Sequence, residues 1–131
     1  MIIDGKNAIL GRLAAFAAKE ALKGEEISVV NCEQIFITGN RKNIMENFEA
    51  KRKRVGSTQK GPKISRTNEK IVKMTIRGML PNARMTGRGR DAIKRIKCYT
   101  GIPKEFEGKK MISMEKQIVK GIKVKEITKK W

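Results

Sequence analysis

The chain has 131 residues, of which 31 are Lys or Arg and 13 are Asp or Glu, so the net charge at neutral pH is +18. This length suffices for one hydrophobic core, and a hydrophobic fraction of 39% predicts a folded chain. A small folded body with this charge repels itself, which predicts a polyanionic partner. A membrane surface is disfavoured, because the only Trp is Trp131 and no apolar stretch is long enough to span a bilayer. The N-terminus lacks a basic segment followed by an apolar run, so we expect a cytoplasmic protein.

The first forty residues predict a β-α-β unit. Residues 2–3 are a short apolar strand, and Leu and Ala recur at helical spacing over residues 10–22. Gly24 lies where glycine commonly ends a helix. Further apolar strands are predicted at residues 27–30 and 35–37. Apolar strands that alternate with helices favour a parallel sheet covered on both faces.

The next segment predicts a second helix and a basic loop. Thr38 and Asn40 are both favourable N-cap residues, and Ile44, Phe48 and Val55 would share one face of the helix that follows. Residues 56–68 are polar and basic, without an apolar pattern. We expect this loop to become ordered on RNA.

Two more helices and a core strand are predicted before residue 104. Asn68 is the expected cap of a third helix, which Pro81 ends, and Thr86 is the expected cap of a fourth helix that extends to Ile96. Residues 97–100 form the expected final core strand.

The remainder, residues 104–131, is a C-terminal extension of the predicted single domain 1–131. Within it we expect a helical piece at residues 111–120 and a short strand at 122–125, and we assign it no site.

The positive charge is concentrated in one part of the chain. Residues 41–97 hold 18 Lys or Arg against four acidic residues, and nine of the ten arginines. Residues 1–40 carry a net charge of −1 and residues 98–131 a net charge of +5. Because the guanidinium group offers a planar fork of donors that suits phosphate oxygens, this block predicts nucleic-acid binding.

The residues that usually carry catalysis or bind metal are scarce. The chain has no His, and Cys32 and Cys98 are too few for a thiolate zinc site or a disulfide framework, so both are expected to be reduced and packed on or near strands. Residues 87–92 match a loose G-x-G-x-x-A pattern, but no strand precedes them as a dinucleotide site requires. Glycines beside arginines better suit close approach to phosphate. We therefore predict no catalytic residue, no metal, no cofactor and no small-molecule substrate.

The expected mode of RNA recognition follows from the aromatic residues. The chain has four Phe, one Tyr and one Trp, and most of the Phe positions are expected in the core. Readers of single-stranded RNA use exposed aromatic side chains as stacking platforms. The sequence therefore favours recognition of the backbone and shape of structured RNA by Arg and Lys.

Several motifs, taken in order, resemble a known family. The motifs are TIRGMLP at 75–81, GR at 89–90, KRIKCY at 94–99 and GIP at 101–103, preceded by ID at 3–4, LGRLA at 10–14, VNCE at 30–33 and ITGNR at 37–41. Over residues 2–106 this order closely resembles the ribosomal protein L13 family of the large subunit. The short basic loop without His resembles the archaeal type.

This resemblance implies a three-layer α/β/α domain with a mainly parallel four-stranded sheet. It also implies a non-enzymatic, structural role in the large ribosomal subunit, on ribosomal RNA, beside other ribosomal proteins and early in assembly. The basic block and the resemblance together give these candidate RNA-binding residues: Arg12, Asn40, Arg41, Lys51, Arg52, Lys53, Arg54, Lys60, Lys63, Arg66, Arg77, Arg84, Arg88, Arg90, Lys94, Arg95 and Lys97.

Two other classes of function remain as alternatives. A regulator that binds messenger RNA or DNA outside the ribosome would carry the same basic charge. A nucleotide-dependent enzyme is suggested by the α/β pattern and by the glycines at 87 and 89, although the chain has no His and no phosphate-binding loop.

Overall fold

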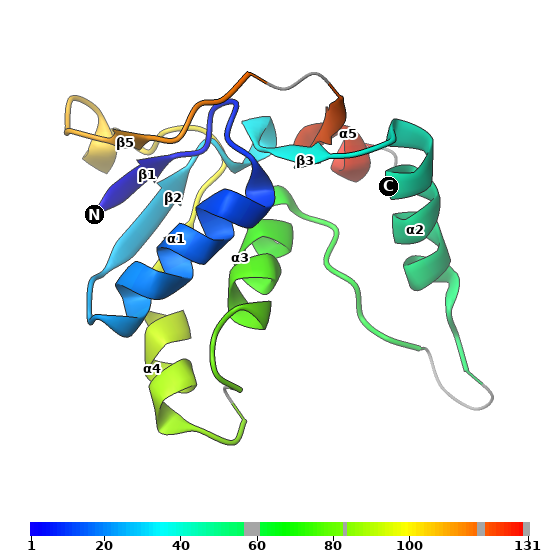
Figure 1. Ribbon diagram of the computed structural model, residues 1–131, viewed down its shortest axis with the longest axis horizontal. Helices are drawn as coiled ribbons and strands as arrows, with labels where there is room; N and C mark the ends of the chain where they lie inside the picture. The colour runs from blue at the N-terminus through cyan, green and yellow to red at the C-terminus, as the bar shows by residue number, and fades with distance from the viewer. Residues whose placement is uncertain (57–60, 83, 118–119, 130–131) are drawn as a thin grey trace.

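A computed structural model describes residues 1–56, 61–82, 84–117 and 120–129 (Figure 1). Its main sheet has the strand order β4-β2-β1-β5, and each pair of neighbours is parallel. The strands are β1 (Ile2–Asp4), β2 (Ile27–Val30), β4 (Ile96–Cys98) and β5 (Ile112–Ser113). Helices flank this sheet. The predicted α/β class with a mainly parallel four-stranded sheet is therefore confirmed.

Helix α1 (Leu10–Leu22) has the predicted bounds. Its Leu and Ala side chains at helical spacing are buried, and small Ala residues let it pack closely against its neighbours. The chain leaves the helix through Gly24, whose φ of +102° lies in the left-handed region that glycine adopts without strain.

The core lies between the main sheet and three helices. Helices α3 (Asn68–Gly78) and α4 (Gly87–Lys94) pack against α1 and against each other, and both contact β4. On the strands, Ile3 pairs with Val29 and Ile27 with Ile96, and all four side chains are buried. Burial of each such side chain contributes about 1.5–3 kcal/mol to stability.

The helix boundaries differ slightly from the predicted ones. The N-cap of α3 is Thr67, one residue before the expected Asn68. Helix α4 begins after Thr86 as expected but ends at Lys94, and Ile96 already belongs to β4. Ile96 pairs with Ile27 of the neighbouring strand, and this pairing ends the helix before its apolar pattern does.

The third predicted strand lies outside the main sheet. Strand β3 (Phe36–Thr38) pairs antiparallel with β6 (Gly121–Lys123) in a second, two-stranded sheet. Its place in the main sheet is taken by β5, which pairs with the edge of β1. The prediction of a helical piece at 111–120 is therefore wrong, because the open edge of β1 offers backbone hydrogen bonds that outweigh local helix propensity.

The last described residues also differ from the prediction. The strand expected at 122–125 ends at Lys123, and helix α5 (Val124–Lys129) follows directly. Val124 and Ile127 are buried, and α5 packs against α3 and against the 3₁₀ turn η1 (Cys32–Gln34). A second 3₁₀ turn, η2 (Lys104–Phe106), lies earlier in the extension.

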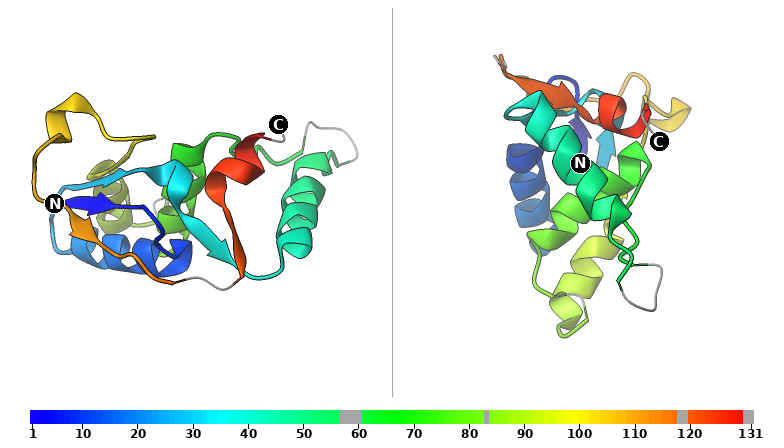
Figure 2. Two further views of the ribbon diagram at one scale, coloured as in Figure 1. Left: turned by 90° about the horizontal axis from the view of Figure 1, so that it is seen from above. Right: turned by 90° about the vertical axis from the view of Figure 1, so that its right-hand side faces the viewer.

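Helix α2 (Arg41–Lys53) contacts strand β6 of the second sheet. Figure 1 and the left view of Figure 2 place it at the opposite end of the molecule from β1 and β2. As predicted, the Asn40 side chain caps it, accepting a hydrogen bond of 3.1 Å from the backbone N–H of Lys42. The prediction that Val55 shares its apolar face is wrong, because the helix ends at Lys53 and Val55 is 57% exposed.

Candidate nucleic-acid interface

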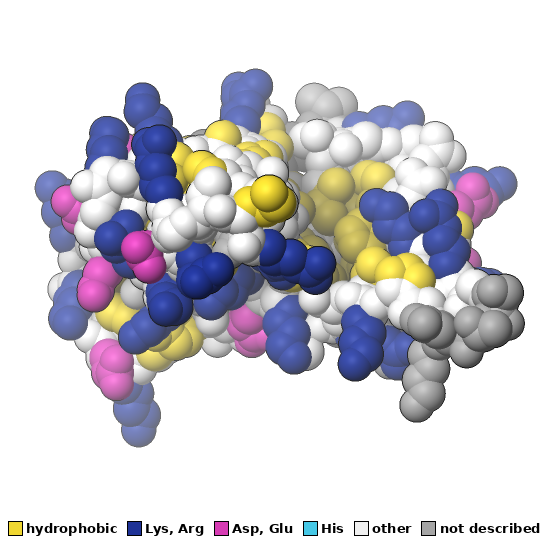
Figure 3. Space-filling view, turned by 90° about the horizontal axis from the view of Figure 1, so that it is seen from below, with side chains coloured by type: hydrophobic (Ala, Val, Ile, Leu, Met, Phe, Trp, Pro, Cys, Tyr) yellow, Lys and Arg dark blue, Asp and Glu magenta, His cyan; other side chains and the backbone are white. Residues whose placement is uncertain are grey.

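Most of the candidate RNA-binding residues are on the surface. Of the sixteen that lie in the described part of the chain, fourteen are exposed, and Arg52 and Arg95 are half-buried. Lys60 lies outside the described residues. Figure 3 shows Lys and Arg side chains gathered on the face seen from below, on both sides of a hollow with apolar side chains.

The first group, here called the α2 cluster, lies at the C-terminal end of α2 and on the segment that leads to α3. It consists of Lys51, Arg52, Lys53, Arg54, Lys63 and Arg66. The Nη2 atom of Arg52 donates a hydrogen bond of 3.2 Å to the backbone oxygen of Ser65. This bond ties the end of α2 to the returning segment. Partial burial, and to a smaller extent the charge of Arg66, lowers the pKa of Arg52.

The second group, here called the α3–α4 cluster, lies on α3, on α4, between these two helices and on the strand β4 that follows them. It consists of Arg77, Arg84, Arg88, Arg90, Lys94 and Lys97. Asn82 organises the turn, because its backbone oxygen accepts a 2.9 Å hydrogen bond from the Thr86 hydroxyl. Its side-chain Oδ1 accepts another, of 3.0 Å, from the backbone N–H of Arg84. These two bonds join Asn82 to Arg84 and to the residue that precedes α4, the helix that carries Arg88, Arg90 and Lys94.

Arg95, Arg41 and Asn40, like Arg52, hold parts of the protein together. The Nη1 atom of Arg95 donates a 3.1 Å hydrogen bond to the backbone oxygen of Ala21 at the C-terminal end of α1. The same oxygen also accepts a 3.1 Å hydrogen bond from the backbone N–H of Gly24. Arg41 forms a 2.7 Å ion pair with Glu126 of α5. Asn40 caps α2. Each of these residues holds elements in place, whatever its further contacts.

Arg12 belongs to neither cluster. It is exposed near the start of α1 and lines a shallow pocket with Ile9 and residues 113–116. The structure therefore brings the α2 cluster and the α3–α4 cluster to one face of the molecule, whereas Arg12 lies beside the β5 segment.

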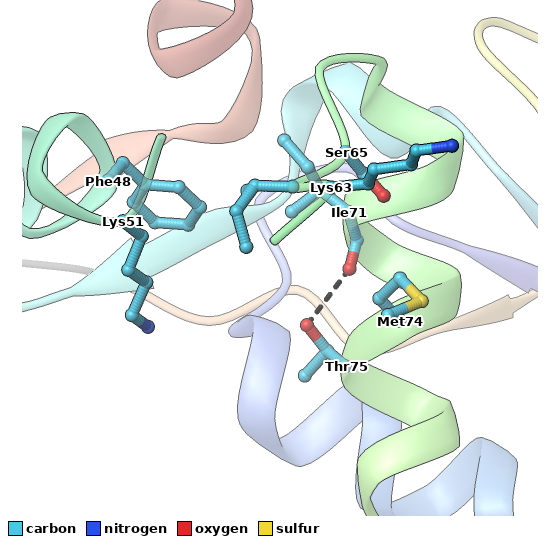
Figure 4. A pocket seen from close by; sticks show the side chains of 8 residues that line it. Phe48, Lys51, Lys63, Ser65, Ile71, Met74 and Thr75 are labelled. Carbon is cyan, nitrogen blue, oxygen red and sulfur yellow. Dashed lines mark hydrogen bonds between the residues drawn. The ribbon is translucent and has the colours of Figure 1, made fainter. Parts of the chain in front are cut away.

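An apolar pocket lies between α2, the segment before α3, and α3 itself. It has a volume of about 240 Å³. The residues that line it are Phe48, Lys51, Lys63, Ile64, Ser65, Ile71, Met74 and Thr75 (Figure 4). Sequence reasoning did not find it, because it assigned most Phe residues to the core. The structure leaves Phe48 half-buried and the Met74 side chain 49% exposed.

The two cysteines, distant in the sequence, are neighbours in the fold. Both are free thiols near strands, as expected. The Cys32 thiol donates a 3.7 Å hydrogen bond to the backbone oxygen of Val29. The polar contact between the Cys32 and Cys98 thiols, together with the positive charge of Lys73, lowers the pKa of Cys98. The same contact with Cys98, followed by burial, raises the pKa of Cys32. Cys98 is half-buried and lines a surface pocket with Lys73, whereas Cys32 is completely buried.

These opposite shifts predict selective alkylation. With iodoacetamide on the native chain, Cys98 should be labelled first, and its rate should rise with pH around a midpoint below the usual thiol value of about 8.5. Replacing Cys32 by Ala removes the polar neighbour of Cys98, so the midpoint for Cys98 should move upward. Cys32→Ser keeps a polar group at that place and should shift the midpoint less. Peptide mapping by mass spectrometry over a pH series measures both. Faster labelling of Cys32 would contradict the assignment.

The basic clusters and most of the main sheet lie in a part of the chain that is similar to known proteins. The family model for ribosomal protein L13 matches residues 1–105, which include both basic clusters and the whole main sheet except β5. The chain belongs to the ribosomal protein L13 family. The matched residues end within η2, so β5, β6 and α5 lie beyond them.

Archaeal members of the L13 family are similar over most of the chain. The large ribosomal subunit protein uL13 of Methanocaldococcus jannaschii is 41% identical over 131 residues, covering 98% of this chain and 94% of that protein. The protein of the same name from Methanosarcina barkeri is 44% identical over 114 residues, covering 86% and 79%. That from Methanococcoides burtonii is 41% identical over 114 residues, covering 87% and 80%. The archaeal type of this L13 chain is thereby confirmed.

The described residues contain no group of three or more His, Cys, Asp or Glu side chains that could hold a metal ion. None of their helices combines the length and apolar character needed to cross a membrane.

Proposed function

We propose that this chain is a structural constituent of the large ribosomal subunit. The observation that carries the proposal is membership of the L13 family, whose archaeal relatives bear the name large ribosomal subunit protein uL13. The net charge of +18 and the two basic clusters on one face support ribosomal RNA as the polyanionic partner.

The proposed binding mode is recognition of phosphates by a rigid surface. The α3–α4 cluster is held by the hydrogen-bonded turn at Asn82, and the α2 cluster by the bond from Arg52 to Ser65. Arginine forks and lysine ammonium groups fixed in this way contact backbone oxygens without reading bases. Placing these contacts on a folded body fixes the register of the protein on structured RNA and supports an early role in assembly.

The role is not catalytic, and it places the protein in the cytoplasm within the particle, beside other large-subunit proteins. Exposed surface outside the clusters, including the C-terminal extension, is available to such neighbours. No small-molecule substrate is part of this proposal.

Sedimentation of a cell extract through a sucrose gradient in high-salt buffer tests the proposal. The chain is expected in the large-subunit peak and not in the small-subunit peak, because multiple phosphate contacts within a folded particle resist salt better than contacts with free RNA. Absence from both peaks would contradict the ribosomal role and favour a regulator that binds other nucleic acids. RNA crosslinked to the chain would then identify that partner.

A further inference from the structure

The apolar pocket between the basic clusters is formed by three segments. Figure 4 shows Phe48 of α2 on one side and Met74 and Thr75 of α3 on the other. Ile64, from the connecting segment, and Ile71, which is only 5% exposed, add further apolar surface. A volume of about 240 Å³ lies below the range of about 300–1,000 Å³ typical of sites for drug-sized ligands and cofactors. The pocket therefore suits one small ring system.

Cations surround the aromatic ring of this pocket. Lys51 Nζ and Arg52 Cζ each lie 6.0 Å from the centroid of the Phe48 ring. Lys63 lines the pocket from the connecting segment. A flat aromatic surface beside cations is the combination that binds single-stranded nucleic acid, where a base stacks and its flanking phosphates pair with Lys or Arg.

The pocket also offers polar atoms for the edge of a base. The Thr75 hydroxyl donates a 3.0 Å hydrogen bond to the backbone oxygen of Ile71, so its oxygen retains lone pairs that can accept a bond from a base N–H, such as the N3–H of uracil. The Ser65 side chain lies in the same lining. Stacking and edge contacts together are how proteins hold unstacked RNA bases.

We propose that this pocket binds one unstacked nucleobase of single-stranded RNA, stacked against Phe48, with Lys51 and Lys63 on the flanking phosphates. The inference rests on the proposed function and adds to it a site where a base, and not only the backbone, is held. The charge of the rim selects this occupant. An apolar protein side chain would fill the same volume, but the cations at the rim favour a polyanion.

Two RNA probes of equal charge test the inference. One is a fluorescently labelled decamer of uridines, and the other is a decamer of the same length in which every residue is an abasic ribose. Fluorescence anisotropy with the full chain measures both affinities. The wild-type chain should prefer the uridine decamer by roughly 5- to 150-fold, the range that follows from the loss of one stacked base.

Variants at Phe48 locate that preference. Phe48→Ala should reduce the preference to near one while affinity for the abasic decamer changes little, and Phe48→Trp should retain it. The matched control is Phe106→Ala, because Phe106 also has a cation near its ring, Lys109 Nζ at 5.6 Å, but lies outside this pocket. Circular dichroism confirms folding of each variant.

The possible failures are distinct. Equal binding of both decamers by the wild-type chain would overturn the pocket while leaving phosphate binding intact. Loss of preference in Phe106→Ala as large as in Phe48→Ala would also overturn it. No binding of either decamer at low salt would count against the proposed function and the inference together. Phe48→Ala could instead leave the preference for the uridine decamer unchanged and cause loss of a neighbouring protein from reconstituted subunits. That result would overturn the inference and show that the pocket binds a protein side chain.

Discussion

Replacing Arg88, Lys94 and Lys97 together by Glu is expected to abolish incorporation of the chain into large subunits. All three side chains are exposed in the α3–α4 cluster. Each lost phosphate contact makes the slope of log affinity against log salt less steep by about one. The slope should therefore change from roughly −5, for about six contacts, to roughly −2. Repulsion from the introduced carboxylates adds to this loss, and affinity should fall at least ~100-fold at physiological salt.

The variant leaves Arg95 intact because its hydrogen bond to Ala21 belongs to the fold. A matched control reverses three exposed lysines of the C-terminal extension, Lys104, Lys110 and Lys116, which changes the net charge by the same amount. The control should retain most of the affinity for ribosomal RNA, measured by filter binding over a salt series. Equal losses in the two variants would show that net charge, and not the α3–α4 cluster, determines binding.

Local signals in the sequence predicted the elements that are fixed by their own residues. The apolar spacing of α1 and the glycine after it gave both of its ends, because a buried face and a left-handed turn are local properties. Asn40 likewise marked the start of α2. The end of α2 was predicted too far along the chain. An apolar residue at helical spacing, Val55, does not by itself continue a helix in which no residue is fully buried.

The elements that the sequence did not predict are those that depend on pairing between distant segments. Strand β5 forms on the edge of β1, more than a hundred residues away, and β3 finds its partner in β6. No pattern within residues 111–120 carries that information. Sequence position also did not indicate that Cys32 and Cys98 would meet, because they are brought together only when η1 packs beside β4.

The candidate nucleic-acid interface could likewise be predicted only in part from the sequence. Charge concentrated in residues 41–97 identified the basic surface, because cations are exposed wherever they lie in the fold. The structure sorted these residues into two clusters and showed that Arg95, Arg41 and Asn40 hold elements together. The apolar pocket could not be predicted from the sequence, because it forms only where α2 and α3 lie on either side of the segment around Ile64.

Gly89→Ala is expected to destabilise the protein, although the same change at most helix positions stabilises it. Gly89 lies inside α4 and is buried. A Cβ atom placed there would lie 2.8 Å from the carbonyl carbon of Pro81 and closer still to its oxygen. Because the obstacle is backbone, the turn at Pro81 or the helix must move, and such overpacking typically costs about 1–3 kcal/mol. The glycine therefore serves close packing within the protein, where the sequence suggested approach to phosphate.

Gly87→Ala is the matched control, two residues earlier in the same helix. A Cβ there meets no atom within 4 Å, so the substitution should be neutral or raise the free energy of unfolding by up to ~1 kcal/mol. Urea unfolding followed by circular dichroism compares the two variants. Since α4 carries Arg88 and Lys94, its displacement in Gly89→Ala should also weaken RNA binding, while Gly87→Ala keeps it. Equal stability of the two variants would mean that α4 does not depend on its contact with Pro81.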